Sequence, residues 1–449
     1  MENIKIVVIG AGSAVFSLNL IRDICLTPSL RGATISLVDI NKERLNAIYA
    51  LFRRYSDELN VQLNIEKTTN RREVLKDADF VINTALATGH PRLREGWSIA
   101  EKYGYRFGGS LHIMHDEAFW INFYQFRLFE EIIEDILDLC PNAWYIQLAN
   151  PVLAGITYLG RKYPEAKIVG LCHGFRGVYH VANVLGLDVK DISFEAPGVN
   201  HFIWLTHFYY RGEDAYPLLD EWIEGHATEY WRRCSFSDAM GPKAIDLYKR
   251  FGLLPIGDTC TPGGGSWPFW YHVSKDVEEQ WREDPKSWWK NYFSGLEQRV
   301  NKIFEVALNP NVKVTTVFPP KKSGEIIVPL IESLAFDVPR VLQVNILNTG
   351  SYVPGIPQDF EVEVPALVSK RGIQGIRTTG LPKRILSYLL RDRIAPVEIE
   401  LEAYERGDKD MLHQLIMMDP WTKSEEQAKK LLDDILSLPY NEGMRRHYK

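Results

Sequence analysis

Short apolar runs alternate with helical periods in the first third of the chain. Residues 5–9 form a continuous β-branched run that meets glycine at once, which is typical of a buried strand in a parallel sheet. Apolar residues then recur at helical spacing from Phe16 to Cys25, and a second β-branched run at residues 34–38 ends in Asp39. A third run, at residues 79–85, ends in small polar residues. This order of strands and helices predicts an α/β fold with a Rossmann-type parallel sheet.

The alternation continues to about residue 170 and then changes character. A long amphipathic helix is predicted at residues 120–139, followed by strands at residues 144–148 and 168–171. Beyond residue 191, helical stretches mix with strands that we predict at residues 202–210, 312–317, 341–346 and 361–364. Residues 381–449 are almost wholly helical in pattern. Because no Pro/Gly/Ser-rich linker separates the parts, we predict two continuous domains, 1–190 with the parallel sheet and 191–449 of mixed α+β structure.

The first strand leads into a glycine turn at residues 10–15 (Gly-Ala-Gly-Ser-Ala-Val). Gly10 permits a tight turn, Gly12 lets the backbone approach a pyrophosphate, and the N-terminus of the following helix supplies free N–H groups and a positive dipole. Asp39 stands where a carboxylate accepts hydrogen bonds from an adenosine ribose, which favours NAD over its 2′-phosphorylated form. Val15 occupies the place of the usual third glycine, so a glycine turn without a ligand stays the alternative. The predicted dinucleotide-binding residues are Gly10, Gly12, Ser13, Ala14, Val15, Asp39 and Asn83.

Composition and charge exclude several classes of protein. The 449 residues are 45% hydrophobic and 24% charged, as in ordinary globular proteins, and at roughly 150 residues per domain the length suggests two to three domains. The net charge of −6, without a long basic run, argues against a nucleic-acid partner. The pattern predicts neither a membrane span nor a signal peptide. Five cysteines, an odd number, argue against a disulfide framework and predict a reducing cytoplasm.

Reactive side chains follow strands or turns in three short segments, at residues 170–174, 198–201 and 257–265. Cys172 and His201 are of the types that bind divalent metals once deprotonated, so a metal site with open positions is one interpretation. The two residues are 29 positions apart (201 − 172), which forms no tight ligand motif. A buried free cysteine and a satisfied core histidine are the other interpretation.

A further polar cluster contains His112, His115, Asp116 and Glu117. On a helix, His112 and Asp116 would share a face. The cluster is either a wall of a metal or substrate site or the solvated start of a helix. The chain contains no G-x-S-x-G, H-E-x-x-H or P-loop motif, so serine-hydrolase, zinc-peptidase and nucleotide-hydrolase interpretations lack their motifs.

In combination, these motifs resemble those of glycoside hydrolase family 4, the NAD- and metal-dependent glycosidases that do not use a pair of carboxylates. The resemblance runs nearly end to end and is carried by residues 9–16, 78–83, 148–151, 170–174, 198–201, 254–259, 361–368 and 418–424. It implies a C-terminal lobe like that of lactate and malate dehydrogenases. His173 follows Cys172 where the 6-phospho branch of the family usually carries Asp or Asn, so the resemblance favours the branch that acts on unphosphorylated sugars.

The reaction that the resemblance implies is hydrolysis without net redox change. NAD⁺ takes a hydride from sugar C3, a base removes the acidified C2 proton, and a divalent metal stabilises the enediolate. The aglycone leaves C1 by elimination, water adds, and the hydride returns. The resemblance implies Cys172 and His201 as the metal ligands, with Mn²⁺ expected, Asp258 as the C2 base, and His173 as a catalytic residue near the leaving group.

The resemblance does not identify the substrate. It places Asn150 and Asn200 at the sugar. Arg92, Arg106 and Arg176 are candidate partners for an anionic sugar, because Arg binds carboxylate in a bidentate fork; a surface or structural role is the alternative for each. We assign Arg176 to substrate binding.

The resulting hypothesis is a cytoplasmic enzyme, a homodimer or homotetramer, that acts on a small glycoside or oligosaccharide. It would hydrolyse α-glycosidic bonds of an unphosphorylated sugar or a uronic acid, that is, a glucoside, glucuronide or galacturonide. The alternative is an NAD-dependent sugar or hydroxy-acid dehydrogenase, which shares the N-terminal domain but releases NADH.

Overall fold

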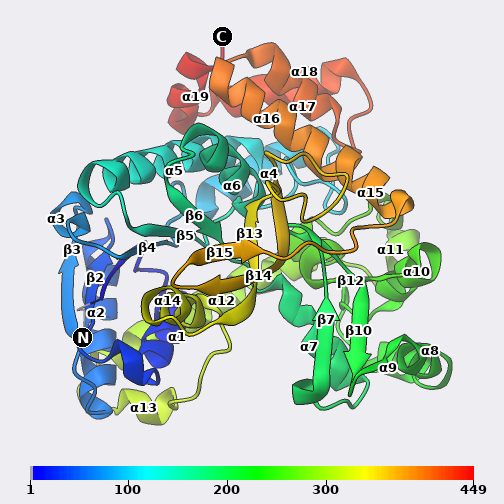
Figure 1. Ribbon diagram of the computed structural model, residues 1–449. Helices are drawn as coiled ribbons and strands as arrows, with labels where there is room; N and C mark the ends of the chain where they lie inside the picture. The colour runs from blue at the N-terminus through cyan, green and yellow to red at the C-terminus, as the bar shows by residue number, and fades with distance from the viewer. Residues whose placement is uncertain (1–3) are drawn as a thin grey trace.

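One sheet of 12 strands runs through the molecule in the order β12-β9-β8-β14-β13-β6-β5-β4-β1-β2-β3, with β15 paired to β14. Figure 1 shows the computed structural model, which describes residues 4–449. The strands from β3 to β6 in this order are parallel. They are β3 (Asn64–Thr68), β2 (Thr34–Val38), β1 (Lys5–Ile9), β4 (Phe80–Asn83), β5 (Trp144–Gln147) and β6 (Lys167–Gly170).

Helices cover both faces of this parallel part, which explains why its inner strands are apolar without alternation. Strand β1 pairs with β2 and β4, so that Ile9 lies between Val38 and Asn83 at the carboxyl end of the sheet. The helices are α1 (Ala14–Cys25), α2 (Lys42–Glu58), α3 (Arg72–Leu75), α4 (His90–Lys102), α5 (Phe119–Leu139) and α6 (Val152–Lys162). The strand–helix order predicted for the first 170 residues and the α/β fold class are confirmed.

The sheet continues without a break into antiparallel strands. Strand β13 (Arg340–Leu347) pairs with β6 through Asn345 and Gly170. Beyond it follow β14 (Glu361–Ser369), β15 (Gly372–Gly375), β8 (Gly198–Val199), β9 (Phe202–Leu205) and β12 (Leu254–Ile256). A separate small sheet contains β7 (Ile192–Glu195), β10 (His207–Tyr210) and β11 (Glu213–Asp214). This geometry places residues from both halves of the chain on one sheet.

The remaining helices surround these strands. In the middle of the chain they are α7 (Gly177–Val184), α8 (Tyr216–Gly225), α9 (Ala227–Arg233), α10 (Pro242–Phe251), α11 (Lys275–Trp281), α12 (Pro285–Leu308), α13 (Val314–Val317) and α14 (Ile327–Phe336). The C-terminal helices are α15 (Lys383–Leu389), α16 (Ala395–Arg406), α17 (Lys409–Met417), α18 (Glu425–Ser437) and α19 (Glu442–His447). Residues 381–449 are thus mainly helical, as their pattern predicts. Figure 1 shows α16 to α19 together over α5.

One predicted strand is wrong and another is only partly right. Residues 312–317 were predicted as a strand, but they contain the short helix α13, because the Glu58 carboxylate accepts hydrogen bonds from the backbone N–H groups of Val314 and Thr315 (2.9 and 2.8 Å). Residues 202–210 form two strands in different sheets, β9 and β10. The chain turns at Thr206, whose N–H donates to the carbonyl of Glu195 (2.8 Å).

The segment at residues 103–118 is irregular rather than the start of a helix. Helix α5 begins only at Phe119, so the suggested helical face shared by His112 and Asp116 is wrong. The N–H of Met114 donates to the Ser110 hydroxyl (3.1 Å), which is one of the local bonds that replace a helical ladder. His115 is fully buried in this segment.

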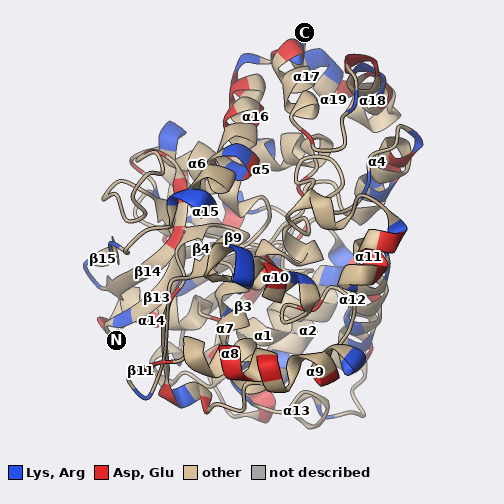
Figure 2. Ribbon diagram, turned by 90° about the vertical axis from the view of Figure 1, so that its right-hand side faces the viewer, with Lys and Arg blue, Asp and Glu red and all other residues tan. Residues whose placement is uncertain are grey.

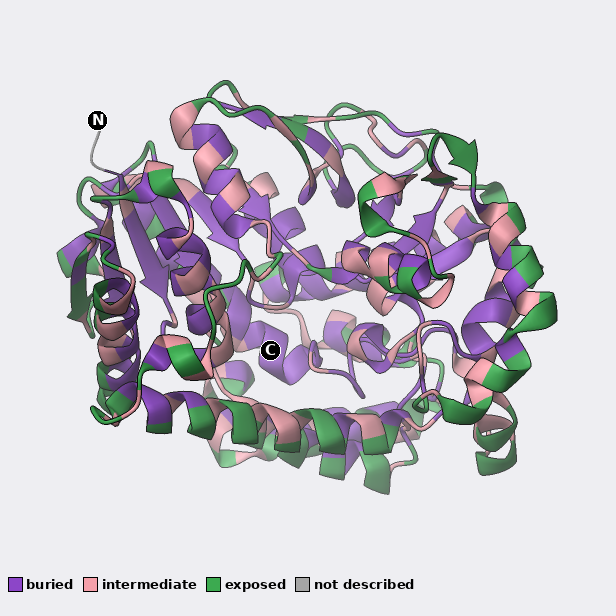
Figure 3. Ribbon diagram, turned by 90° about the horizontal axis from the view of Figure 1, so that it is seen from below, coloured by how far each residue is buried: buried purple, intermediate pink, exposed green. Residues whose placement is uncertain are grey.

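Buried and charged residues are distributed as expected for a globular protein. Figure 3 shows that the inner strands of the large sheet are buried while edge strands and the outer helices carry exposed residues. Figure 2 shows Lys, Arg, Asp and Glu mainly on outer helices such as α9 and α11, with few on the strands. Among residues 4–449, no helix combines the length and apolar character that a bilayer crossing needs.

Candidate active site

A groove of about 690 Å³ lies at the carboxyl ends of β1, β2 and β4. Its lining includes the predicted residues Gly10, Gly12, Ser13, Ala14, Val15 and Asp39. Gly10 has a φ of +81°, and a Cβ there would lie 2.5 Å from the backbone nitrogen of Ala85, so the turn requires glycine. The Ser13 side chain does not cap helix α1, so N–H groups at the first turn stay available for an anion.

Asp39 holds the glycine turn against the second strand. Its Oδ2 accepts a hydrogen bond from the Gly12 N–H (2.7 Å), and its Oδ1 accepts one from the Asn41 N–H (2.8 Å). Ile40 is 90% exposed beside the groove, which gives a flat base an apolar surface to cover. The groove therefore has the glycine turn, the helix N-terminus and the acidic residue that a dinucleotide needs.

Asn83 lies outside this lining. It is fully buried, its Nδ2 donates to the Tyr145 hydroxyl (2.8 Å), and its Oδ1 accepts from the Ala85 N–H (3.0 Å). The structure therefore places Asn83 beneath the turn at residues 84–87, which does line the groove.

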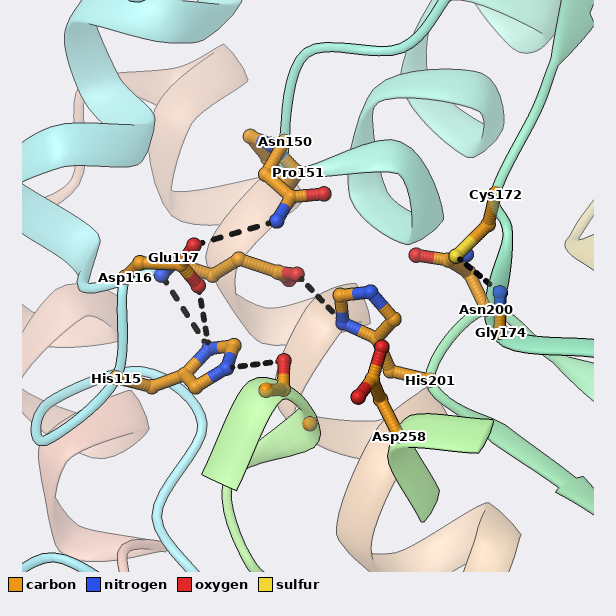
Figure 4. A network of polar contacts seen from close by, with 12 residues as sticks. His115, Asp116, Glu117, Asn150, Pro151, Cys172, Gly174, Asn200, His201 and Asp258 are labelled. Carbon is orange, nitrogen blue, oxygen red and sulfur yellow. Dashed lines mark hydrogen bonds and ion pairs between the residues drawn. The ribbon is translucent and has the colours of Figure 1, made fainter. Parts of the chain in front are cut away.

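A second cavity, of about 350 Å³, lies at the carboxyl ends of β5 and β6. Cys172 and Asp258 line it together with His201, and their candidate ligand atoms all lie within 4.8 Å of one another. Cys172 follows β6, His201 lies in the β8–β9 turn with a φ of +59°, and Asp258 follows β12. The folded sheet thus brings together residues that are far apart in the sequence (Figure 4).

The donor set of this cluster fits a divalent cation of the transition series. A thiolate and an imidazole are ligands for such ions and leave coordination positions open, while the Asp258 carboxylate lies beside them. Burial raises the pKa of the Cys172 thiol, although the hydrogen bond with His201 acts in the opposite direction. Metal binding must therefore release the thiol proton.

Glu117 orients His201. Its Oε1 lies 3.2 Å from Nδ1 of His201, and both side chains are buried. Burial acts to raise the pKa of Glu117, but the hydrogen bond and charge of His201 outweigh it, so the carboxyl pKa is lowered. The contact occupies Nδ1 and leaves Nε2 for the cluster with Cys172 and Asp258.

Asn200 lies on two buried glutamates of β14. Its N–H donates to Oε2 of Glu361 (3.1 Å), and its Nδ2 donates to Oε2 of Glu363 (3.3 Å). Its Oδ1 is buried and has no hydrogen-bond partner among the described residues. Burial raises the pKa of Glu363 to about 7 and that of Glu361 well above its usual value.

The opposite wall of the cavity is aromatic. Trp288, Trp289 and Tyr292 of helix α12 line it, and Trp289 is only 4% exposed. Flat aromatic faces of this kind pack against the C–H faces of sugars. Residues 267–289 contain five tryptophans, which are therefore divided between core packing and the wall of a ligand site.

The other predicted residues differ in their positions. Asn150 and His173 line the cavity, and His173 is exposed at it. Arg176 is outside the lining; its guanidinium lies 3.9 Å from the Glu325 carboxylate, and Glu325 itself lines the cavity. Arg92 and Arg106 lie over the rings of Tyr440 and Trp421 and do not line the cavity.

The polar cluster of the sequence contributes to the site. Of the two alternatives for it, a wall of a metal or substrate site and a solvated helix start, the first agrees with the structure, because Asp116 lines the cavity and Glu117 contacts His201. Two further residues, Glu361 and Glu363, were not predicted. Glu361 and Glu363 lie two positions apart in an otherwise apolar strand, which places them on one face. Two acidic residues at alternate positions of an apolar strand were the feature of the sequence that could have indicated these site residues.

Most of the chain matches two family models. One, described as family 4 glycosyl hydrolase, covers residues 5–187, and the other, described as its C-terminal domain, covers residues 196–422. An α-glucosidase of Erwinia rhapontici is 25% identical over 96% of this chain and 97% of the relative. An α-galacturonidase of Lachnoclostridium phytofermentans is 26% identical over 97% of this chain and 96% of the relative.

Solved structures confirm the fold. A 6-phospho-α-glucosidase from gut microorganisms, in complex with NAD and Mn²⁺, has a TM-score of 0.78 at 20% identity and covers 99% of each chain. A lactate dehydrogenase from Eimeria maxima with NADH and oxamate has a TM-score of 0.53 at 14% identity, covering 91% of this chain and 96% of that one. The expected Rossmann-type domain with a dehydrogenase-like second lobe is thus confirmed.

Proposed function

The chain belongs to family 4 of the glycosyl hydrolases, and we propose that it is an NAD- and divalent-metal-dependent glycosidase. Its reaction is the hydrolysis of α-glycosidic bonds of an unphosphorylated sugar or a uronic acid. One observation carries this proposal: the dinucleotide groove and the Cys172–His201–Asp258 cavity both lie at the carboxyl ends of parallel strands of a single sheet. In open α/β sheets ligands bind at that edge.

The cofactors supply what the side chains cannot. When bound, NAD⁺ would supply a reversible hydride acceptor, and a divalent cation, with Mn²⁺ expected, would supply Lewis-acid stabilisation of negative charge on the sugar. Gly12 and Asp39 would hold the dinucleotide, and Cys172 and His201 would hold the metal.

The chain's own residues position the sugar and move its protons. Asp258 is the base for the C2 proton, and the Thr261 hydroxyl orients it by donating to Oδ1 (2.8 Å). Asn150 lines the cavity and binds a sugar hydroxyl, whereas Asn200 is buried outside the described lining and would have to turn its unpartnered Oδ1 toward the cavity to accept from another. His173, exposed at the cavity, lies near the leaving group.

The charge of the cavity supports an unphosphorylated substrate. Its described lining contains the carboxyl groups of Asp116, Asp258 and Glu325 and no Lys or Arg. A phosphate dianion would face these groups without an Arg or Lys partner in the described lining. A uronic acid would need Arg176 to exchange Glu325 for the sugar carboxylate, and this exchange is the role we propose for Arg176.

We also propose a cytoplasmic homodimer or homotetramer. Cys172 must stay reduced to bind a metal, and a reducing compartment meets that need. Light scattering after size-exclusion chromatography measures the assembly.

The decisive experiment is a panel of p-nitrophenyl α- and β-glycosides and uronides, supplied with NAD⁺ and Mn²⁺ under reducing conditions. We expect release of p-nitrophenol from an α-glycoside without accumulation of NADH absorbance at 340 nm. A dehydrogenase would accumulate NADH in proportion to the product. Turnover of a glycoside by enzyme stripped of all NAD would contradict the proposed function.

A further inference from the structure

Two carboxyl groups line the cavity in different surroundings. Asp258 accepts a hydrogen bond from Thr261 and lies in the cluster with Cys172 and His201. Asp116 instead lies beside His115, with Oδ1 3.2 Å from the imidazole Nδ1. Carboxyl groups with contrasting surroundings in one site commonly divide the acid and base roles.

Hydrogen bonds on both sides fix the state of the His115 ring. Nε2 lies 2.9 Å from the carbonyl oxygen of Gly263, and a carbonyl can only accept, so Nε2 carries a proton. Nδ1 lies 3.3 Å from the backbone nitrogen of Glu117, and that N–H can only donate. Nδ1 therefore presents a lone pair, and the imidazole is the neutral Nε2–H tautomer.

This tautomer places one proton on Asp116. An ionised carboxylate would set an anionic oxygen against the Nδ1 lone pair at 3.2 Å. Oδ1 of Asp116 is enclosed and has no other partner among the described residues, so water cannot relieve that contact. A proton on the carboxyl group turns the same contact into a hydrogen bond that shares the Nδ1 lone pair with the long N–H contact from Glu117. Burial also raises the pKa of Asp116.

The carboxyl group can present this proton to the cavity. Asp116 lines the cavity, its side chain is 30% exposed, and Oδ2 has only a 3.4 Å contact with Nδ2 of Asn150. The terminal torsion of Asp is broad and two-fold, so a half-turn exchanges the two oxygens. Figure 4 shows Asp116 between His115 and Asn150, on the side of Glu117 away from Cys172.

We propose that Asp116 is the acid that protonates the departing glycosidic oxygen, with His115 as the positioning residue that keeps it protonated. The inference rests on the proposed function. As the C1–O bond breaks, its electron pair goes to oxygen, which takes the Asp116 proton, while the pair left by C2 deprotonation forms the C1=C2 bond. Water then adds at C1 and gives a proton back to the Asp116 carboxylate. The proton count closes without another reactant.

The proposal predicts a dependence on the leaving group. Asp116→Asn keeps the shape of the side chain but removes the acidic proton. On a methyl α-glycoside, whose leaving group needs protonation, we expect kcat/KM to fall about 10²- to 10⁴-fold. On the 2,4-dinitrophenyl glycoside of the same sugar, whose phenolate leaves unprotonated, the fall should stay within about 10-fold.

A second readout follows the proton at C2. In D₂O, Asp116→Asn should return unreacted methyl glycoside that carries deuterium at C2, measured by NMR, because deprotonation precedes the blocked C1–O cleavage. Asp116→Ser, with a smaller side chain, is assayed in parallel, and thermal unfolding and NAD affinity of both variants establish that they are folded.

His173→Gln is the matched comparison, because His173 is the other candidate near the leaving group. Two outcomes overturn the role of Asp116. One is an equal loss on both glycosides by the folded Asp116 variants without C2 exchange. The other is a leaving-group-selective loss in His173→Gln that the Asp116 variants lack. Failure of the proposed function is distinct, because the unaltered enzyme would then turn over no glycoside with NAD⁺.

Discussion

Glu117 Oε1 lies 3.2 Å from Nδ1 of His201, and a matching contact joins Glu400 Oε2 to Nδ1 of His112 at 3.2 Å. Both are buried Glu–His pairs. The segment of residues 103–118, which precedes α5, contributes Glu117 to the first pair and His112 to the second. Only the first pair adjoins Cys172 and Asp258. The two pairs therefore form a natural comparison for the effect of an outer carboxylate on a metal ligand.

Glu117→Gln should weaken metal binding. A neutral amide is a weaker acceptor for the imidazole Nδ1–H than a carboxylate and makes Nε2 a less basic ligand, and loss of such a partner typically costs 10- to 100-fold in metal affinity. Calorimetric titration of the metal-free protein with Mn²⁺ measures the change in metal affinity. Glu400→Gln is the matched control and should keep the affinity within about 3-fold. Equal affinities in the two variants would contradict the orienting role of Glu117.

Gly12→Val should abolish tight NAD binding. A Cβ at Gly12 would lie 2.6 Å from Asp39 Oδ2, and the side chain would stand where the backbone meets the pyrophosphate. We expect at least about a tenfold rise in Kd, or ~1.4 kcal/mol, by fluorescence titration. Gly225→Val, at a position with no atom within 4 Å of the added Cβ, is the control. Unchanged NAD affinity in folded Gly12→Val would refute the placement of the cofactor.

These contacts show where sequence reasoning ends. Local patterns predicted β1, the glycine turn and β2, because the apolar runs, the glycines and Asp39 that identify them all lie within 35 residues of the sequence. They did not predict α13, because its N-terminus is capped by Glu58, some 256 positions away in sequence. The helix propensity of residues 312–317 carries no information about a contact with a residue so far away in sequence.

The same limit applies within the site. Cys172 and His201 are chemically conspicuous and could be chosen from the sequence. Glu117 and Glu363 become site residues only through their contacts with His201 and Asn200, which depend on tertiary packing. Arg176 can bind a carboxylate in a bidentate fork, but in the folded chain its guanidinium lies 3.9 Å from the carboxylate of Glu325 and outside the cavity lining.

Cys172→Ser should lose the bound metal and most of the activity. Serine is a harder and far less acidic ligand than a thiol, so it does not replace a thiolate on a transition metal. Elemental analysis of dialysed protein measures the metal content, and wild-type activity should fall when reductant is withheld. Cys234→Ser, at another partly buried cysteine outside the cavity, should retain both metal and activity. Full metal occupancy in Cys172→Ser would contradict this assignment.

A buried ion pair away from the site offers a test of stability. Lys243 Nζ lies 2.7 Å from Glu283 Oε2, and both side chains are 2% exposed. Lys243→Met leaves the carboxyl group buried without its partner and should lower the free energy of unfolding by about 3–5 kcal/mol. Lys243→Met combined with Glu283→Gln should recover part of that loss. Urea unfolding of wild type, of Lys243→Met, of Glu283→Gln and of the double variant measures it, and additive losses would contradict coupling of the pair.

The C2 proton tests Asp258 and separates this mechanism from direct displacement at C1. If C2 is deprotonated before the C1 bond breaks, product formed in D₂O should carry deuterium at C2, because the abstracted proton exchanges with solvent before its return. Substrate deuterated at C2 or C3 should react more slowly wherever those steps limit the rate. Asp258→Asn should suppress the exchange by about 10²-fold or more, and by more than it weakens NAD or metal binding. Exchange that persists at the normal rate in this variant would remove Asp258 from the role of base. Full activity after complete removal of NAD would instead establish displacement at C1.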